Sequence, residues 1–113
     1  MATPEEIKES LEKWIKLMEK PEVKEEFEGF NKTLQFIFPD IDYHLKMIFK
    51  DQAATLIDGY DKDAEMSLEI NSDLFTGICK GDVDPMEVFM EGELKIKGDM
   101  NAIQRLEIFM EFE

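Results

Sequence analysis

The chain has 113 residues, of which 43% are hydrophobic and 35% charged, a composition typical of one folded domain over residues 1–113 rather than of a disordered segment. Its formal net charge is −14, and a field of that sign repels nucleic acid and anionic membrane surfaces, so nucleic-acid binding and stable membrane association are excluded as expected functions. A single cysteine excludes an intramolecular disulfide, and we expect a cytoplasmic protein with neither a signal peptide nor a membrane span.

Two helices are predicted at the start of the chain. Thr3-Pro4-Glu5-Glu6 has the form of a capping box with proline at the first helical position, and Pro21 prevents simple continuation of that helix. The apolar residues of the first helix recur at helical spacing: Ile7, Leu11, Trp14 and Met18. A second, short helix follows with Val23 and Phe27 turned inward, and Gly29 is its expected stop.

After these helices the apolar period changes to two, which indicates half-buried strands. A first strand ends at the Pro39-Asp40 turn, a second follows it, and a third runs through Ala53–Ile57. A fourth strand alternates through Met66–Ile70, after a polar loop. The residues expected on the buried face of the first, second and fourth strands are Leu34, Phe36, Phe38, Tyr43, Leu45, Met47, Phe49, Met66, Leu68 and Ile70.

The last third of the chain is predicted to hold three helices and one strand. Ser72 is the expected cap of a helix that includes Cys79, and Asp84 caps a short helix that begins at a proline. Leu94–Lys97 alternates apolar and charged residues, as a half-buried strand does. Asp99 caps a terminal helix with an apolar stripe formed by Met100, Ile103, Leu106 and Met110. This order of elements predicts an α+β fold with one largely antiparallel sheet.

Part of this region also carries a resemblance. The run Pro85-x-x-x-Phe89-Met90-x-Gly92-x-Leu94-Lys95-Ile96-Lys97-Gly98-Asp99-Met100 closely resembles the signature of the sterol carrier protein type-2 (SCP2-like) lipid-transfer family, and weaker similarity covers most of the chain. The resemblance implies five strands in the order 3-2-1-4-5, with the helices packed on one face. Three residues depart from the family pattern. Val88 is larger than usual and is expected to narrow a cavity, Glu93 makes its rim more acidic, and Glu65 replaces the frequent aspartate before the fourth strand.

Large flexible apolar side chains are frequent in this chain, which has 9 Phe and 8 Met. By themselves they indicate an ordinary core. Together with the resemblance they imply an apolar tunnel between sheet and helices that holds a fatty acid, fatty acyl-CoA, sterol or isoprenoid, because methionine adapts to varied apolar partners. The residues expected to bind this lipid are Phe36, Leu45, Met47, Leu68, Phe75, Met86, Phe89, Met90, Met100, Ile103, Leu106 and Met110.

No catalytic residues, metal ligands or cofactor site are predicted, so we expect a protein that is not an enzyme. His44, the only histidine, lies on the polar face of the second strand, and Cys79 continues an apolar stripe, which indicates a surface histidine and a buried, inert thiol. Lys95 and Lys97 share one strand face. They are interpreted as an exposed face paired with neighbouring acids, with a lipid head-group site at the pocket mouth as the alternative.

Two functions therefore stay open. The first is a stand-alone intracellular carrier of a small-molecule lipid. The second is an accessory subunit that presents a lipid, such as a quinone precursor, to partner enzymes and so has a protein partner or forms a homodimer. In both cases the terminal helix is expected to be a lid over the tunnel mouth. A chain without residues 101–113 would then stay folded but bind lipid at least about tenfold more weakly.

Overall fold

Five strands form one sheet in the order β3-β2-β1-β4-β5. The computed structural model describes residues 1–111, and for residues 102, 103, 110 and 111 it describes the backbone only. The strands are β1 (Lys32–Phe38), β2 (Tyr43–Lys50), β3 (Ala53–Asp58), β4 (Met66–Glu69) and β5 (Lys95–Lys97). Neighbouring strands are antiparallel except β1 and β4, which run parallel. The predicted fold class and strand order are confirmed.

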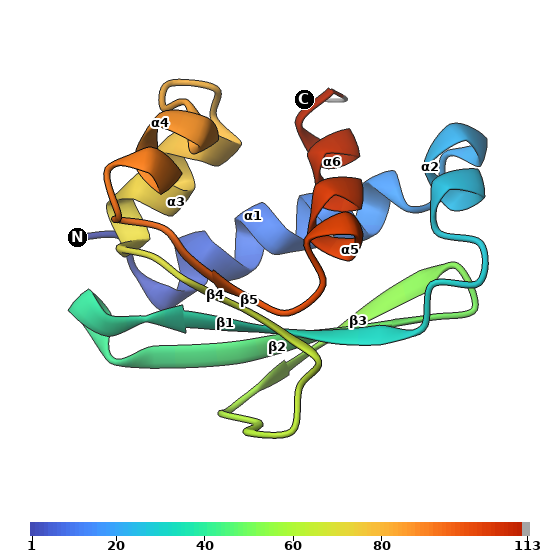
Figure 1. Cartoon of the computed structure of the whole chain (residues 1–113), viewed down its shortest axis with the longest axis horizontal. Helices are drawn as coiled ribbons and strands as arrows, with labels where there is room; N and C mark the ends of the chain where they lie inside the picture. The colour runs from blue at the N-terminus through green and yellow to red at the C-terminus, as the bar shows by residue number, and fades with distance from the viewer. Residues whose placement is uncertain (112–113) are drawn as a thin grey trace.

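The helices of the described chain pack on one face of this sheet (Figure 1). The α-helices are α1 (Pro4–Leu17), α2 (Pro21–Glu26), α3 (Ser72–Cys79), α4 (Pro85–Met90), α5 (Met100–Gln104) and α6 (Ile108–Glu111). Two 3₁₀ turns are η1 (Pro39–Ile41) and η2 (Arg105–Glu107). The strand side chains that face the helices close the core, as the period of two predicted: Leu34, Phe36, Phe38, Leu45, Met47, Phe49, Met66 and Leu68 are all buried.

The connection from β3 to β4 crosses the opposite face of the sheet (Figure 1), and one buried amide fastens it there. Gln35 is buried on that face, and its side-chain nitrogen donates to the carbonyl oxygens of Leu45 (3.0 Å) and Gly59 (3.1 Å). Its side-chain oxygen accepts the Asp61 N–H at 2.6 Å. Because a buried amide must find partners, Gln35 selects the path of this loop.

The predicted helix caps are found at three of four positions. The Thr3 hydroxyl and the Glu6 carboxylate form the capping box of α1, and Asp84 accepts the Met86 N–H at 3.0 Å at the start of α4. Asp99 accepts the Asn101 N–H at 2.9 Å. These bonds satisfy backbone donors that the first turn of a helix leaves open.

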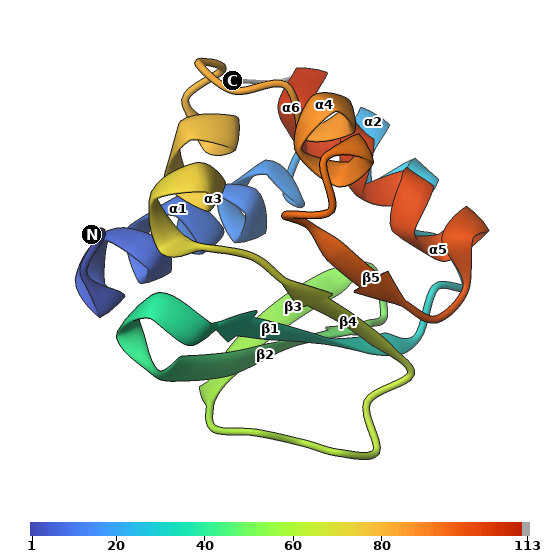
Figure 2. The same cartoon turned by 60° about the vertical axis from the view of Figure 1, so that its left-hand side comes forward.

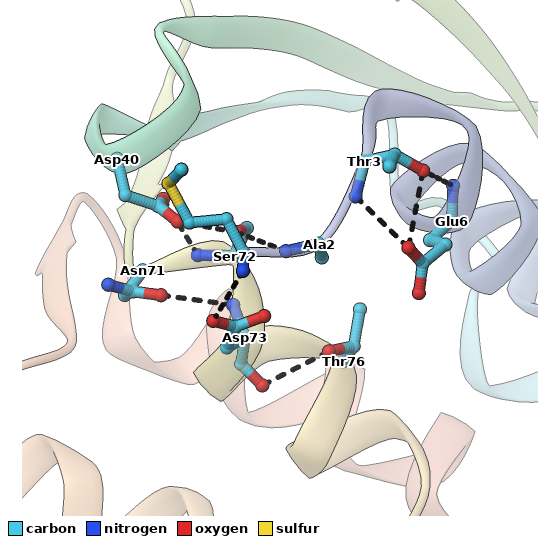
Figure 3. A network of polar contacts seen from close by, with 9 residues as sticks. Ala2, Thr3, Glu6, Asp40, Asn71, Ser72, Asp73 and Thr76 are labelled. Carbon is cyan, nitrogen blue, oxygen red and sulfur yellow. Dashed lines mark hydrogen bonds and ion pairs between the residues drawn. The ribbon is translucent and has the colours of Figure 1, made fainter.

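The prediction that Ser72 caps α3 is wrong, because Asn71 caps it by accepting the Asp73 N–H at 3.0 Å. Ser72 is buried and donates its backbone N–H (2.9 Å) and its hydroxyl (2.5 Å) to Asp40, while its hydroxyl oxygen accepts the Ala2 N–H (Figure 3). Burial raises the pKa of Asp40, but the hydrogen bonds from Ser72 outweigh it and hold that pKa below its ordinary value. The network joins the start of α1, η1 and α3.

The C-terminal segment is not the single amphipathic helix that was predicted, because the 3₁₀ turn η2 interrupts it. Leu106 of η2 and Phe109 of α6 are both buried in the core. The ring of Phe109 is 1% exposed and stacks on Trp14 and Phe27, with centroids 4.8 and 5.4 Å away. Met100, the first residue of the predicted stripe, lies at the surface instead.

Candidate lipid pocket

A pocket of about 460 Å³ opens between β4, β5 and the helices α3, α4 and α5, and we call it the α4 pocket. Figure 2 shows these elements gathered around β5. The residues that line it are Trp14, Leu68, Ile70, Phe75, Ile78, Asp84, Pro85, Met86, Phe89, Leu94, Ile96, Met100, Gln104, Leu106 and Glu107. Its volume falls in the range of sites that hold small apolar ligands.

The floor of the α4 pocket is apolar and buried. It consists of Trp14, Leu68, Ile70, Phe75, Ile78 and Leu106. Leu68 of β4 is the register partner of Ile96 on β5, so these two side chains lie next to each other on the face that the helices cover. Ile96 and Leu94 are half-buried and form the wall between floor and opening. No charged side chain belongs to this floor or wall.

The rim of the pocket is exposed and still mostly apolar. Met86 and Phe89 of α4 are 59% and 41% exposed, and Met100 across the opening is 46% exposed. Large apolar side chains gathered around an opening mark a binding surface more often than scattered ones do. An apolar ligand in the pocket would cover all three.

Six of the twelve side chains predicted to bind lipid line this pocket: Leu68, Phe75, Met86, Phe89, Met100 and Leu106. Phe36, Leu45 and Met47 lie instead in the closed core, each fully buried, because the rings of Trp14 and Phe75 pack on Phe36 and seal the centre of the sheet. Met90 is not among the lining residues and is 79% exposed. Ile103 and Met110 fall outside the described side chains.

Sequence reasoning missed several apolar lining residues: Trp14, Ile70, Ile78, Leu94 and Ile96. Each of them stands at an inward position of a predicted helix or strand, so their periodicity carried the signal. Of the departures from the family pattern, Val88 is the buried residue of α4 and is not among the lining residues, so it does not narrow this opening directly.

Lys95 and Lys97, for which a head-group site was the alternative interpretation, are not at the mouth of the pocket. Their register partners are Glu69 and Ser67, on the sheet face opposite the helices, and the Lys95 ammonium lies 3.5 Å from the Glu69 carboxylate. The alternation of β5 sends Ile96 inward and both lysines outward. The interpretation as a paired, exposed sheet face is therefore supported.

Arg105 does not reach the pocket either. Its guanidinium donates to the Glu26 carbonyl oxygen at 3.1 Å and lies 5.3 Å from the centroid of the Phe30 ring, so it fastens η2 to α2.

A second hollow of about 420 Å³ borders the stacked rings of Trp14 and Phe109, and we call it the lysine groove. Its lining residues are Ser10, Lys13, Trp14, Lys16, Leu17, Lys20, Cys79, Lys80 and Phe109. Cys79 is half-buried there rather than fully buried as predicted. Trp14 lines both hollows, so the single tryptophan of the chain reports on ligands in either.

The histidine of the chain lies apart from the α4 pocket. His44 is half-buried on the sheet face away from the helices, as predicted, with its ring edge-on to Tyr60 at 5.6 Å. Within the described residues, no group of three His, Cys, Asp or Glu side chains could hold a metal ion. None of the helices described is both long and apolar enough to cross a membrane.

A model of the SCP-2 sterol transfer family matches residues 11–111 of the chain. Comparison with curated proteins gave no match.

Among solved structures, the chain resembles UbiJ-SCP2, a ubiquinone synthesis protein, with 15% identity over 90% of this chain and 88% of that chain and a TM-score of 0.68. It resembles the sterol carrier protein domain 2 of Helicoverpa armigera with 14% identity over 97% and 91% of the two chains and a TM-score of 0.68. It also matches part of the sec-alkylsulfatase Pisa1 from Pseudomonas sp., with 17% identity over 74% of this chain and a TM-score of 0.65, but spans only 13% of that enzyme. At these identities the likeness shows the fold.

Proposed function

We propose that this chain, which belongs to the SCP-2 sterol transfer family, is a non-enzymatic lipid carrier that holds the apolar tail of one lipid molecule in the α4 pocket. The observation that carries the proposal is the continuity of apolar side chains from floor to rim. Leu68 is buried at the bottom, Ile96 is half-buried, and Met86 is largely exposed at the opening. An alkyl tail that enters this pocket therefore contacts apolar side chains from the rim to the floor.

Burial of apolar surface is the expected driving force. About ten buried methylene groups contribute about 8 kcal/mol before the costs of association are subtracted. The flexible side chains of Met86 and Met100 at the rim support a carrier that tolerates variation in tail shape. The lipid classes expected from the family resemblance (fatty acid, acyl-CoA, sterol, isoprenoid) all offer such a tail.

Titration with an alkyl ligand, followed by Trp14 fluorescence, tests the proposal, because Trp14 is the only tryptophan and belongs to the pocket floor. We expect a saturable change with close to one dodecanol molecule bound per chain. A signal that rises without saturation, or only above the solubility limit of the ligand, would contradict a pocket.

Two methionines of α4 provide a matched pair of variants. Met86→Gln replaces a side chain that lines the pocket, and Met90→Gln replaces one on the same helix that does not. Both are exposed, so neither change should affect folding by more than about 0.5 kcal/mol. We expect Met86→Gln to weaken dodecanol binding at least about threefold, which corresponds to about 0.7 kcal/mol, and Met90→Gln to leave it unchanged. Equal effects of the two changes would place the ligand elsewhere.

A second candidate function is presentation of a lipid to partner enzymes. It is favoured by the likeness to UbiJ-SCP2, which is described as a ubiquinone synthesis protein and which this chain matches over 90% of its length. Met90, exposed beside the pocket but outside it, would then contact a partner. Purification from native cells separates the two functions. A carrier co-purifies with lipid alone, whereas an accessory subunit co-purifies with a stoichiometric amount of a partner protein. In the second case, Met90→Gln should weaken the association with that partner.

A further inference from the structure

The polar residues of the α4 pocket are few, and the charged ones are acidic. They are Asp84 at the start of α4, Gln104 at the end of α5 and Glu107 in η2, and all three are exposed at the rim. Asp84 uses one carboxylate oxygen to accept the Met86 N–H at 3.0 Å. Among the described residues, none donates to its other oxygen or to the Glu107 carboxylate.

The basic residues that could receive an anionic head group lie elsewhere. Lys95 and Lys97 are on the far face of the sheet, and Arg105 is held by α2 through Glu26 and Phe30. The lysines of the lysine groove do not line the α4 pocket, and Trp14 is the one residue common to the described linings of the two hollows. No lysine or arginine belongs to the described lining of the α4 pocket.

From this distribution we propose that the α4 pocket selects lipids whose polar end is a hydrogen-bond donor, uncharged or cationic, and rejects lipids whose polar end is anionic. The inference rests on the proposed function, which supplies the site, and adds the class of head group. With the tail on the floor, the head lies at the rim beside Asp84 and Glu107. A hydroxyl group there donates to a carboxylate oxygen, and such charge-assisted bonds are stronger than neutral ones.

An anionic head meets the opposite situation. A carboxylate or phosphate at the rim faces two carboxylates in a chain of net charge −14, and none of the described lining residues is a cation that could pair with it. Of the classes expected from the family resemblance, sterols and isoprenoid alcohols satisfy the rim, whereas ionised fatty acids and acyl-CoA do not.

Three ligands that share one tail and differ only in head group test this inference: dodecanol, dodecanoate and dodecylammonium, titrated at pH 7.5 and read out by Trp14 fluorescence. We expect dodecanol to bind at least tenfold more tightly than dodecanoate, which corresponds to about 1.4 kcal/mol. Dodecylammonium should bind at least as tightly as dodecanol. The difference between alcohol and carboxylate should narrow in high salt, because rim charges are exposed to solvent.

The double variant Asp84→Asn/Glu107→Gln should reduce the preference for dodecanol over dodecanoate to less than threefold. Asparagine is as good an N-cap as aspartate, so α4 should remain capped. Glu91→Gln is the matched control: it removes one exposed negative charge at the other end of α4, outside the pocket lining, and should leave the preference unchanged.

The outcomes separate the two proposals. If none of the three ligands saturates, the lipid carrier itself is wrong. If dodecanol saturates and dodecanoate binds equally tightly with an affinity that Met86→Gln lowers, the carrier stands and the head-group selection is overturned. A third outcome is that dodecanoate binds with an affinity that Met86→Gln does not change but that the double variant Lys13→Gln/Lys16→Gln lowers. Dodecanoate then occupies the lysine groove, and its exclusion from the α4 pocket is supported.

Discussion

The substitution Phe109→Ala decides whether the C-terminal segment is a lid, as its amphipathic stripe suggested, or part of the core. Phe109 is 1% exposed and stacks between Trp14 and Phe27. Truncation of a buried phenylalanine to alanine costs about 3–5 kcal/mol through lost burial and the cavity left behind. Lost stacking with two rings places this residue toward the upper part of that range.

The free energy of unfolding is measured by urea denaturation, followed by Trp14 fluorescence and independently by far-UV circular dichroism. We expect Phe109→Ala to lower it by about 3 kcal/mol or more and to lower Tm by about 12 °C or more. Met100→Ala, in the same segment but at the rim, is the matched control and should cost less than about 1 kcal/mol while weakening dodecanol binding.

A loss below 1 kcal/mol for Phe109→Ala would refute this reasoning and restore the lid. If the reasoning holds, removal of residues 101–113 does not leave a folded sheet, contrary to the expectation from sequence. It takes Phe109 and Leu106 out of the core together and exposes Trp14 and Phe27. The segment then contributes to the pocket as a fixed wall, through Met100, Leu106 and Glu107, and not as a lid.

Two further predictions concern the frame that holds the pocket. Gly98→Ala should lower the free energy of unfolding by at least about 1 kcal/mol more than Gly59→Ala. Both glycines have positive φ, 110° and 119°. Of the two, only Gly98 lies so close to another backbone atom that an added Cβ would clash with it, at 2.5 Å from the Glu65 carbonyl oxygen. Comparable losses in urea denaturation would show that β4 and β5 can move apart to admit a methyl group. Asp40→Asn should destabilise the protein more at pH 7 than at pH 3. Because hydrogen bonds from Ser72 lower the pKa of Asp40, ionised Asp40 stabilises the fold above its unfolded pKa of about 3.9, and this contribution is lost as the pH falls through the lower folded value. A difference between wild type and variant that grows on acidification would contradict that sign.

Local signals in the sequence determined the elements and their buried faces. The period of two turned Leu45, Met47 and Phe49 of β2 toward the helices, because successive side chains of a strand point to opposite faces. Thr3 and Asp84 marked helix starts, because a capping side chain acts within three residues of its own position. The strand order lay beyond these local rules and followed from the family resemblance.

Polar residues in the interior were beyond the same rules. Gln35 lies in a predicted strand and Ser72 was predicted to be a helix cap. Both are buried, because their hydrogen-bond partners come from loops that are distant in sequence. The 3₁₀ turn at Arg105–Glu107 was likewise not predicted from the helical spacing of the terminal segment. Such contacts join segments that are far apart in sequence, and the sequence separation of two segments does not indicate how close they lie in the folded structure.

Only the tertiary structure decided which inward side chains surround a void and which close the core. Phe36 and Leu68 stand at equivalent inward positions of neighbouring strands and are register partners, but Trp14 and Phe75 cover the first, whereas Leu68 contributes to the pocket floor. Periodicity specifies the direction of a side chain and not the volume above it. That volume is set where α1, α4 and the C-terminal segment meet over β4 and β5, and it depends on contacts between residues as far apart as Trp14 and Phe109.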